Sequence, residues 1–284
     1  MAKATAVANP NIALIKYWGR ADDALNLPAN PSLAMNLAAL TTVTTVEFRP
    51  GLVADVVLID GQAAEEPALG RVVRHLDRVR AMAGISAPAW VASRNDFPAG
   101  TGLASSASAF AALSAAASHA AGLSLGEADL SRLARLGSGS ACRSVPAGFT
   151  LWSGDRDEAS FARQIAPPEH WDLHDVVAIV SETHKDVGSD DGHSLASSSP
   201  FHNARLAAIP EQLERMRAGI ESRDLQAIGP TMEADALAMH GVMMTSRRSL
   251  LYWQPATVAV MREVRRWRAG GLAVYFTMDA GPNV

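Results

Sequence analysis

Apolar and polar residues alternate in short runs through the first half of the chain, and this pattern predicts strands mixed with helices. The β-branched run Thr41–Phe48 and the apolar run Val56–Ile59 predict strands, and Asp60 with Gly61 after the second run predicts a hairpin turn. Apolar residues at helical spacing over 69–82 predict a helix, and Ala89–Ser93 predicts a further strand.

The middle of the chain is dominated by a segment rich in Ala and Ser. It predicts a long helix that begins near Leu103 and ends around Gly122. Ser124, followed three residues later by Glu127, predicts a capping box at the start of the next helix. Residues 148–152 then predict a strand that closes this half.

The second half has a different pattern. Helical periodicity appears over 201–217, 224–239 and 255–268, and apolar runs predict strands over 176–180 and 273–277. Strands mixed with helices, without regular βαβ alternation, indicate an α+β fold. We place a domain boundary near residue 172, which divides the chain into 1–171 and 172–284.

Composition narrows the class of protein. With 284 residues, 48% of them hydrophobic and 19% charged, the chain can bury a large core, which excludes a disordered protein. A net charge of −4 with scattered arginines gives no footprint for nucleic acid. The single cysteine, Cys142, excludes a disulfide framework and a multi-cysteine metal site. The first residues lack signal-peptide architecture, so we expect a cytoplasmic protein.

Residues 98–126 carry no Asp, Glu, Lys or Arg, and such a stretch is long enough to span a bilayer. Its small residues and His119 would transfer poorly into lipid, however, and they suit a helix packed closely inside a protein. We therefore expect no membrane partner.

The first segment with evident chemistry is the glycine-rich stretch 95–108. Gly100 and Gly102 allow a ligand to approach the backbone, and the following helix offers free N–H groups, which together suit a phosphate. Ser105 and Ser106 could reach phosphate oxygens or Mg²⁺. A Walker A loop would need a lysine here, and a Rossmann loop would need a strand running directly into the first glycine. Glycine content alone leaves an ordinary loop as the alternative.

The sequence Gly-Leu-Ala-Ser-Ser-Ala-Ser over 102–108 resembles the phosphate loop of the GHMP kinases, in the version typical of the diphosphomevalonate decarboxylases. Segments 11–19, 26–30, 137–144 and 275–283 resemble other motifs of the same decarboxylases, in the same order. The resemblance covers nearly the whole chain.

This resemblance implies a GHMP-kinase two-domain fold. The N-terminal ATP-binding domain would hold a left-handed βαβ phosphate-loop unit, and the C-terminal domain would be a ferredoxin-like α/β sandwich. It also implies ATP and Mg²⁺ as cofactors, mevalonate 5-diphosphate as substrate, and a homodimer. The family phosphorylates the tertiary 3-hydroxyl with ATP, then loses phosphate and carbon dioxide to leave isopentenyl diphosphate.

Residue roles follow from the matched motifs. The resemblance implies that Asp279 is the base or orienter for the 3-hydroxyl, that Lys16 lies beside it, and that Arg143 holds the substrate carboxylate. A planar guanidinium can bind a carboxylate through two parallel hydrogen bonds, which a lysine cannot. Without the family context, the alternatives are that Asp279 caps a helix or forms an Asx-turn and that Lys16 is an exposed lysine at the end of a strand.

The remaining site residues fall into two groups. The resemblance assigns the substrate to Tyr17, Arg20, Ser138, Gly139, Ser140, Arg143 and Ser194, and the nucleotide to Pro98, Gly100, Gly102, Leu103, Ala104, Ser105, Ser106 and Ser108. Ser138 and Ser140 could also belong to an ordinary turn, and the match around Ser194 is the weakest. We interpret His184, His193 and His240 as ordinary histidines, since they lack metal-ligand spacing.

Two departures keep other interpretations open. Where the family usually has Lys, this chain has Arg20 followed by Ala21. This change reduces the positive charge near the diphosphate end of the substrate. Because a monophosphate needs less positive charge, a phosphomevalonate decarboxylase acting on mevalonate 5-phosphate is the alternative. A small-molecule kinase of this fold, such as a mevalonate 3-kinase, and a non-catalytic binding protein are further alternatives.

The second departure is at the C-terminus. Family chains continue past the last motif with a helix and a strand, whereas Asp279 here lies five residues from the end. We therefore expect a truncated sequence in which the aspartate is weakly restrained.

Overall fold

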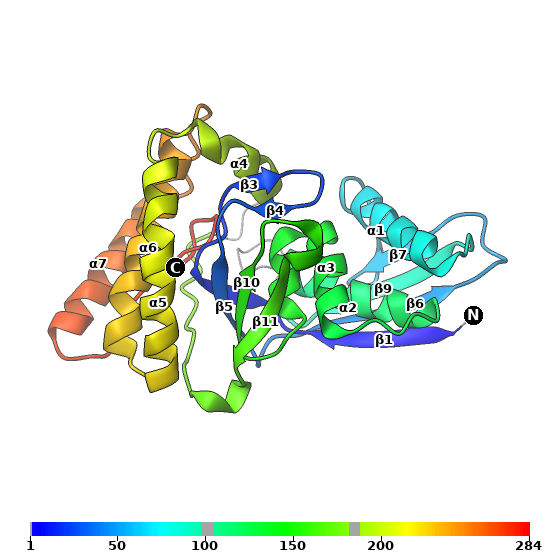
Figure 1. Cartoon of the computed structure of the whole chain (residues 1–284), viewed down its shortest axis with the longest axis horizontal. Helices are drawn as coiled ribbons and strands as arrows, with labels where there is room; N and C mark the ends of the chain where they lie inside the picture. Colours follow the sequence, from blue (N-terminus) through cyan, green and yellow to red (C-terminus); the bar gives the residue numbers. More distant parts are fainter. Residues whose placement is uncertain (1, 98–104, 182–187) are drawn as a thin grey trace.

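The computed structural model describes residues 2–97, 105–181 and 188–284. Sheets and the first helices occupy one end of an elongated molecule, and long helices occupy the other (Figure 1). The strands are β1 (Lys3–Ala8), β2 (Asn11–Ile15), β3 (Arg20–Asp22), β4 (Leu27–Pro28), β5 (Ser32–Asn36), β6 (Thr42–Phe48), β7 (Val56–Ile59), β8 (Gln62–Ala63), β9 (Ala89–Asn95), β10 (Phe149–Ser153) and β11 (Phe161–Ala166).

All the α-helices except α4, which was not predicted, lie on the predicted helical segments. They are α1 (Ala68–Ala83), α2 (Ser105–Ala120), α3 (Glu127–Gly137), α4 (Ser189–Leu195), α5 (His202–Ser222), α6 (Leu225–Thr245) and α7 (Pro255–Ala269), with a 3-10 helix η1 (Gly139–Ser144) after α3. The α+β prediction is confirmed. Within the described residues, no helix is both long and apolar enough to cross a bilayer.

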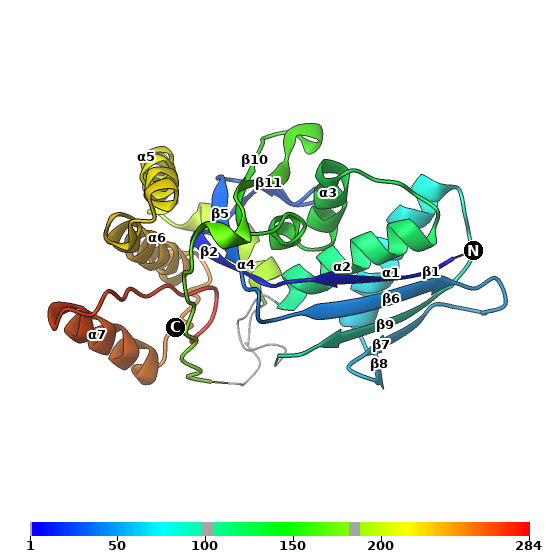
Figure 2. The same cartoon turned by 90° about the horizontal axis from the view of Figure 1, so that it is seen from below.

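The larger sheet has the strand order β1-β6-β9-β7-β8, and only the β7–β9 pair is parallel. Alternate residues of β6 are buried, and they pack with α1 and α2 on one face of the sheet (Figure 2). Val46 and Val91 of the sheet share this core with Phe110 and Leu113 of α2. The small residues of α2 thus serve close packing against the sheet, as the sequence indicated.

The hairpin predicted at Asp60 and Gly61 is present between β7 and β8. Both residues have positive φ, 50° and 82° respectively, which matches the backbone that a two-residue hairpin turn needs. This local prediction is confirmed.

The smaller sheet, in the order β11-β10-β5-β2, joins the two ends of the molecule. Leu33 and Phe149 from this sheet form one core with Ile209 of α5 and Ile228 of α6. β2 therefore lies against the long helices, and the residues that follow it, starting at Lys16, emerge where both ends of the molecule meet.

The capping box predicted at Ser124 is wrong. Helix α3 begins at Glu127, and its N-cap is Gly126, which makes no side-chain capping bond. Helix α2 ends in a turn through Gly122 at a φ of 81°, and the first helical hydrogen bond of α3 runs from Leu130 to the carbonyl of Gly126. Ser124, which the pattern placed at the start of the helix, therefore belongs to the turn that links α2 to α3.

The strands predicted over 176–180 and 273–277 do not form ladders in the structure. The segment 172–181 and the C-terminal segment exchange one pair of backbone hydrogen bonds, between Ala178 and Val284. Side chains take other amides: Asn283 Oδ1 accepts from Val180, and Glu233 Oε1 accepts from Phe276. The helical layer of the expected α/β sandwich is present as α5, α6 and α7.

Candidate active site

The centre of the site is an ion pair between residues from the two ends of the chain. Lys16 is 1% exposed, and its Nζ donates to Asp279 Oδ1 at 2.6 Å, while the carboxylate remains 26% exposed. A ring nitrogen of His240, Nε2, lies 3.0 Å from the backbone oxygen of Asp279. The pair is thus buried on the lysine side and open on the aspartate side.

The backbone of Lys16 is fixed by a second ion pair underneath. Its N–H donates to Asp235 Oδ2 at 2.6 Å, and its carbonyl accepts from Arg205 Nη2 at 2.8 Å and from Asn30 Nδ2 at 2.9 Å. Asp235 and Arg205 are themselves paired at 2.9 Å and almost fully buried. No sequence pattern indicated this support, because the two residues lie on separate helices.

Arg143 is the predicted carboxylate ligand, and its surroundings are unusual for a buried cation. It is 3% exposed, yet its hydrogen bonds go to neutral groups, with Nε donating to Asn11 Oδ1 at 3.1 Å and Nη1 to Ser32 Oγ at 2.5 Å. Burial lowers the pKa of the guanidinium. Across the described residues no carboxylate forms an ion pair with it, so the site can accept a carboxylate from a ligand.

Tyr17 forms a wall of the site. Its ring packs edge-on against Trp152 at 4.7 Å and stacks on His193 at 4.0 Å, and its hydroxyl accepts from Arg20 Nε at 3.1 Å. Burial raises the pKa of Tyr17 to about 12, so it stays a neutral phenol. His193, which was not among the predicted site residues, also helps to shape this wall, because its Nδ1 accepts the N–H of Gly19 at 3.1 Å.

The predicted Ser-Gly-Ser loop lies directly under Tyr17. A Cβ on Gly139 would come within 2.7 Å of the tyrosine ring, so only glycine allows this approach. Ser138 Oγ lies 3.3 Å from Ser106 Oγ at the start of α2, and the carbonyl of Ser140 accepts from Asn11. The predicted substrate loop and the first turn after the predicted nucleotide loop are therefore in contact.

A small cationic cavity of about 250 Å³ opens beside Arg20. Arg20 Nη2 pairs with Asp190 Oδ1 at 2.6 Å, and Arg71 Nη2 lies 3.4 Å from Asp190 Oδ2. The lining residues are Arg20, Asn26, Arg71, Arg74, Arg78, Leu136, Gly137 and Asp190. Only Arg20 was predicted; the other arginines lie on α1, where their helical spacing indicated nothing beyond a solvent-exposed face.

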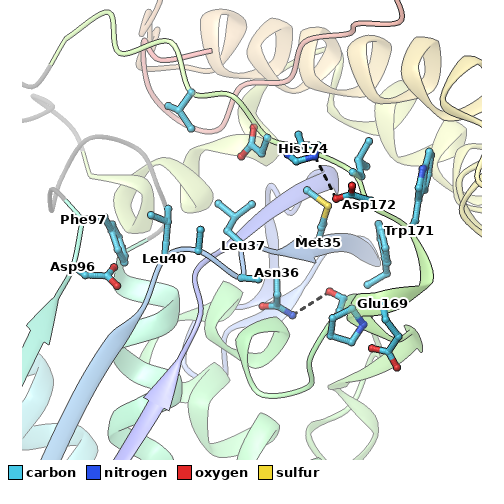
Figure 3. Close-up of a pocket in the computed structure, with 18 residues that line it drawn as sticks. Met35, Asn36, Leu37, Leu40, Asp96, Phe97, Glu169, Trp171, Asp172 and His174 are labelled. Carbon is cyan, nitrogen blue, oxygen red and sulfur yellow. Dashed lines mark hydrogen bonds and ion pairs between the residues drawn. The ribbon is translucent and has the colours of Figure 1, made fainter.

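A second, larger cavity has a volume of about 730 Å³ (Figure 3). Leu37, Leu40 and Trp171 give it apolar walls, and Asp96 and Asp175 are among several carboxylates on its lining. Glu169 and Asp172 also line it, so this cavity carries more carboxylates than the cavity at Arg20.

Asp175 is a carboxylate that sequence reasoning missed. Its side chain keeps an exposed surface, yet it lies in the concave wall of the larger cavity. Desolvation by the surrounding atoms raises its pKa, the positive charge of Lys16 acts in the opposite direction, and the negative charge of Asp279 raises the pKa further. It is thus a third ionisable group near the central ion pair.

The structure tests the predicted nucleotide residues only in part. Pro98, Gly100, Gly102, Leu103 and Ala104 lie outside the described residues. Ser105 and Ser106 are half-buried at the start of α2, where their hydroxyls could meet a ligand.

Two other predicted residues point elsewhere. Ser108 is fully buried and its Oγ lies 2.6 Å from Thr42 Oγ1, which favours a packing role over contact with a nucleotide. Ser194 is exposed and donates to Asp23 at 3.0 Å, at the rim of the site and not at its centre.

The mixed α+β fold, with its sheets and first helices at one end and the long helices at the other, is that of the GHMP-kinase class. The structure of mevalonate diphosphate decarboxylase from Enterococcus faecalis is 39% identical, covers 99% of this chain and 87% of that chain, and superposes with a TM-score of 0.91. A structure described as MDDEF in complex with MVAPP, AMPPCP and magnesium is 40% identical over 99% of this chain and 87% of that chain, with a TM-score of 0.93.

Family models match both parts of the chain. Residues 8–162 match the diphosphomevalonate decarboxylase-like N-terminal domain, and residues 175–284 match the mevalonate 5-diphosphate decarboxylase C-terminal domain. The chain therefore belongs to the diphosphomevalonate decarboxylase family.

Individual relatives differ in the substrate that they name. The phosphomevalonate decarboxylase of Haloferax volcanii is 37% identical over 99% of this chain and 87% of the relative. The diphosphomevalonate decarboxylase of Rattus norvegicus is 35% identical over 98% of this chain and 75% of the relative.

Proposed function

We propose that this protein catalyses the ATP-dependent decarboxylation of mevalonate 5-diphosphate to isopentenyl diphosphate. The observation that carries the proposal is the buried pair of Lys16 and Asp279 next to Arg143, a buried cation whose hydrogen bonds go to neutral groups. Together they offer a place for a hydroxyl and a place for a carboxylate on one substrate.

The lysine–aspartate pair acts on the hydroxyl. Asp279 orients the tertiary 3-hydroxyl and accepts its proton as the oxygen attacks the terminal phosphoryl group of ATP. Lys16 holds the carboxylate at 2.6 Å and balances the negative charge that gathers around the transferred group. The phosphorylated oxygen then leaves as phosphate, and the electrons of the breaking carbon–carboxylate bond form the new double bond.

Arg143 orients the carboxylate that departs as carbon dioxide. Since decarboxylation removes the charge that Arg143 binds, an overly strong ion pair would stabilise the substrate more than the transition state. Asn11 and Ser32 position the guanidinium without neutralising it. Arg143 can therefore hold the carboxylate in place while the neutral groups around it keep the guanidinium from rearranging.

The remaining predicted residues bind the phosphate groups. Tyr17, Arg20, Ser138, Gly139 and Ser140 hold the phosphate end of the substrate, with Ser194 at the rim. Ser105 and Ser106, with the glycine-rich segment that precedes them, hold ATP, which supplies the phosphoryl group. Mg²⁺ bound with the ATP would offset the negative charge of its phosphates. We propose that Ser108 supports this loop from within, since it is bonded to Thr42.

Stoichiometry tests the reaction. Purified protein with Mg-ATP and mevalonate 5-diphosphate should release ADP, phosphate and carbon dioxide in equal amounts. Release of ADP without carbon dioxide would contradict decarboxylation and would identify a kinase of the same fold.

A second candidate substrate is mevalonate 5-phosphate, which would give isopentenyl phosphate. The pairing of Arg20 with Asp190 favours it, because that carboxylate reduces the positive charge available to a diphosphate. The similarity to the Haloferax volcanii phosphomevalonate decarboxylase supports it as well. Comparing kcat/KM for the two esters decides, and a higher value for the monophosphate would replace our first proposal.

We further propose that the protein is a cytoplasmic homodimer of two domains, 1–171 and 172–284, as the family resemblance implies. Light scattering of the purified protein should give twice the 29.9 kDa chain mass. A monomeric mass at micromolar concentration would contradict the dimer.

A further inference from the structure

We propose that Asp190 is a specificity-determining residue that discriminates between one and two phosphates at the 5-position of the substrate. The inference rests on the proposed function for its choice of substrates. Its basis is a carboxylate that the protein itself places in the arginine-lined cavity at the phosphate end of the site.

The carboxylate bridges two of the arginines. One oxygen of Asp190 lies 2.6 Å from Arg20 Nη2, and the other lies 3.4 Å from Arg71 Nη2. Arg20 is only 9% exposed and is held from behind by the hydroxyl of Tyr17. Asp190 therefore occupies the position that a phosphate would take to contact both guanidiniums.

The position of Asp190 is set by the backbone of its helix. Three residues further along α4, His193 accepts the N–H of Gly19 and stacks on Tyr17. The helix that carries Asp190 is therefore attached to the same turn that carries Tyr17 and Arg20. This attachment holds the Asp190 backbone near Arg20, which an ion pair between two unrelated surface side chains would not require.

Charge explains the discrimination. The cavity is lined by four guanidiniums and one carboxylate, and a second carboxylate, Asp23, lies 3.5 Å from Arg20 at its edge. A monophosphate can use Arg74 and Arg78 and leave the bridge of Asp190 in place. A diphosphate brings more negative charge toward the same carboxylate, and like charges brought together at a binding site disfavour the more highly charged ligand.

The test is the variant Asp190→Asn, with Asp191→Asn as the matched control. Asp191 is the next residue of α4, is exposed and does not line the cavity. Calorimetry without nucleotide measures the Kd of mevalonate 5-diphosphate, mevalonate 5-phosphate, pyrophosphate and orthophosphate. We expect Asp190→Asn to tighten both diphosphates about tenfold and both monophosphates less than about threefold, with Asp191→Asn unchanged.

Equal changes for mono- and diphosphates would overturn the inference, because they would indicate a general electrostatic effect. Unchanged or weaker diphosphate binding in a variant with wild-type thermal stability would overturn it too. The pyrophosphate and orthophosphate measurements do not depend on decarboxylation. If they differ as expected while neither mevalonate ester is turned over, the proposed function fails and the role of Asp190 stands.

Discussion

Three arginines are buried among the residues that the structure describes, and they differ in what neutralises them. Arg135 is fully buried and pairs with Asp157, and Arg205 is paired with Asp235. Arg143 is equally buried but is bonded to Asn11 and Ser32, which carry no charge. Removing a charge from water costs several kcal/mol unless a partner compensates, so the first two sites are complete within the chain.

The incomplete site is the one to which we assign the substrate carboxylate. A buried cation with neutral partners is expensive to maintain, and a protein that keeps one gains where a ligand supplies the missing charge. Lys16 stands between the two cases, because its carboxylate partner Asp279 is partly exposed and can face a substrate. The difference separates arginines that hold the fold from cations that bind ligands.

The largest effect is expected at Asp279. Asp279→Asn would leave Lys16 as a second cation without a carboxylate and would remove the proton acceptor for the 3-hydroxyl. We expect kcat to fall by about 10³–10⁴, the range for a group that acts directly in proton transfer and charge stabilisation. Coupled measurement of ADP and carbon dioxide checks this, with nucleotide affinity as the control. A near-normal kcat would contradict the role of Asp279.

Arg205→Ala should reduce the stability of the folded protein. It leaves Asp235 buried and unpaired beneath the backbone of Lys16, so we expect the free energy of unfolding to fall by about 3–5 kcal/mol. Urea denaturation followed by fluorescence measures the change. A loss below about 1 kcal/mol would contradict the inference that Arg205 neutralises the buried carboxylate of Asp235.

Arg143→Ala should reduce activity much more than stability. We expect kcat/KM for the mevalonate ester to fall by about 10²–10³, with both KM and kcat affected. The free energy of unfolding should fall less than in Arg205→Ala, because only the neutral groups of Asn11 and Ser32 lose a partner and no buried charge is left unpaired. An effect on ATP affinity alone would contradict the assignment of this residue to the substrate.

The smallest effect concerns a buried base that is neutral instead of paired. His75 lies between α1 and α2, and burial, aided by the charge of Arg78, lowers its pKa to about 3. Its Nε2 lies 2.9 Å from Ser114 Oγ, whose own proton goes to the Phe110 carbonyl, so the histidine donates from Nε2. The unfolded chain takes up a proton near pH 6.5, and the folded protein does so only near pH 3.

Stability should therefore decline as the pH falls below about 6.5, by up to about 1.4 kcal/mol per pH unit from this residue. Urea denaturation at pH 7.5 and pH 5.5 measures the decline. His75→Gln should remove about 1.4 kcal/mol of the difference between the two pH values. An identical pH dependence in the variant would show that other groups cause the decline.

Sequence reasoning located the central pair because motifs fix residue identity even when partners are far apart. Lys16 and Asp279 are 263 residues apart, and each was predicted from its own segment. Asp190, Arg71 and Asp235 were missed, because nothing local distinguishes a cavity-lining charge from a solvated one.

The prediction of secondary structure was wrong where contacts with distant residues take the backbone hydrogen bonds of a segment. The apolar runs 176–180 and 273–277 have the composition of strands, yet side chains of Asn283 and Glu233 bind amides that a ladder would have used. The helices from α5 to α7 were predicted well, because a helix satisfies its own backbone.

The contact between Ser106 and Ser138 has a thermodynamic consequence. Each hydroxyl has one proton to donate, and the 3.3 Å contact means that the two groups can share a hydrogen bond across the two loops. A ligand that takes the proton of one serine changes what the other can offer. By linkage, any factor by which substrate changes the affinity for nucleotide is the factor by which nucleotide changes the affinity for substrate. We therefore expect the proposed substrate and nucleotide sites to influence each other's affinity through this contact between Ser106 and Ser138.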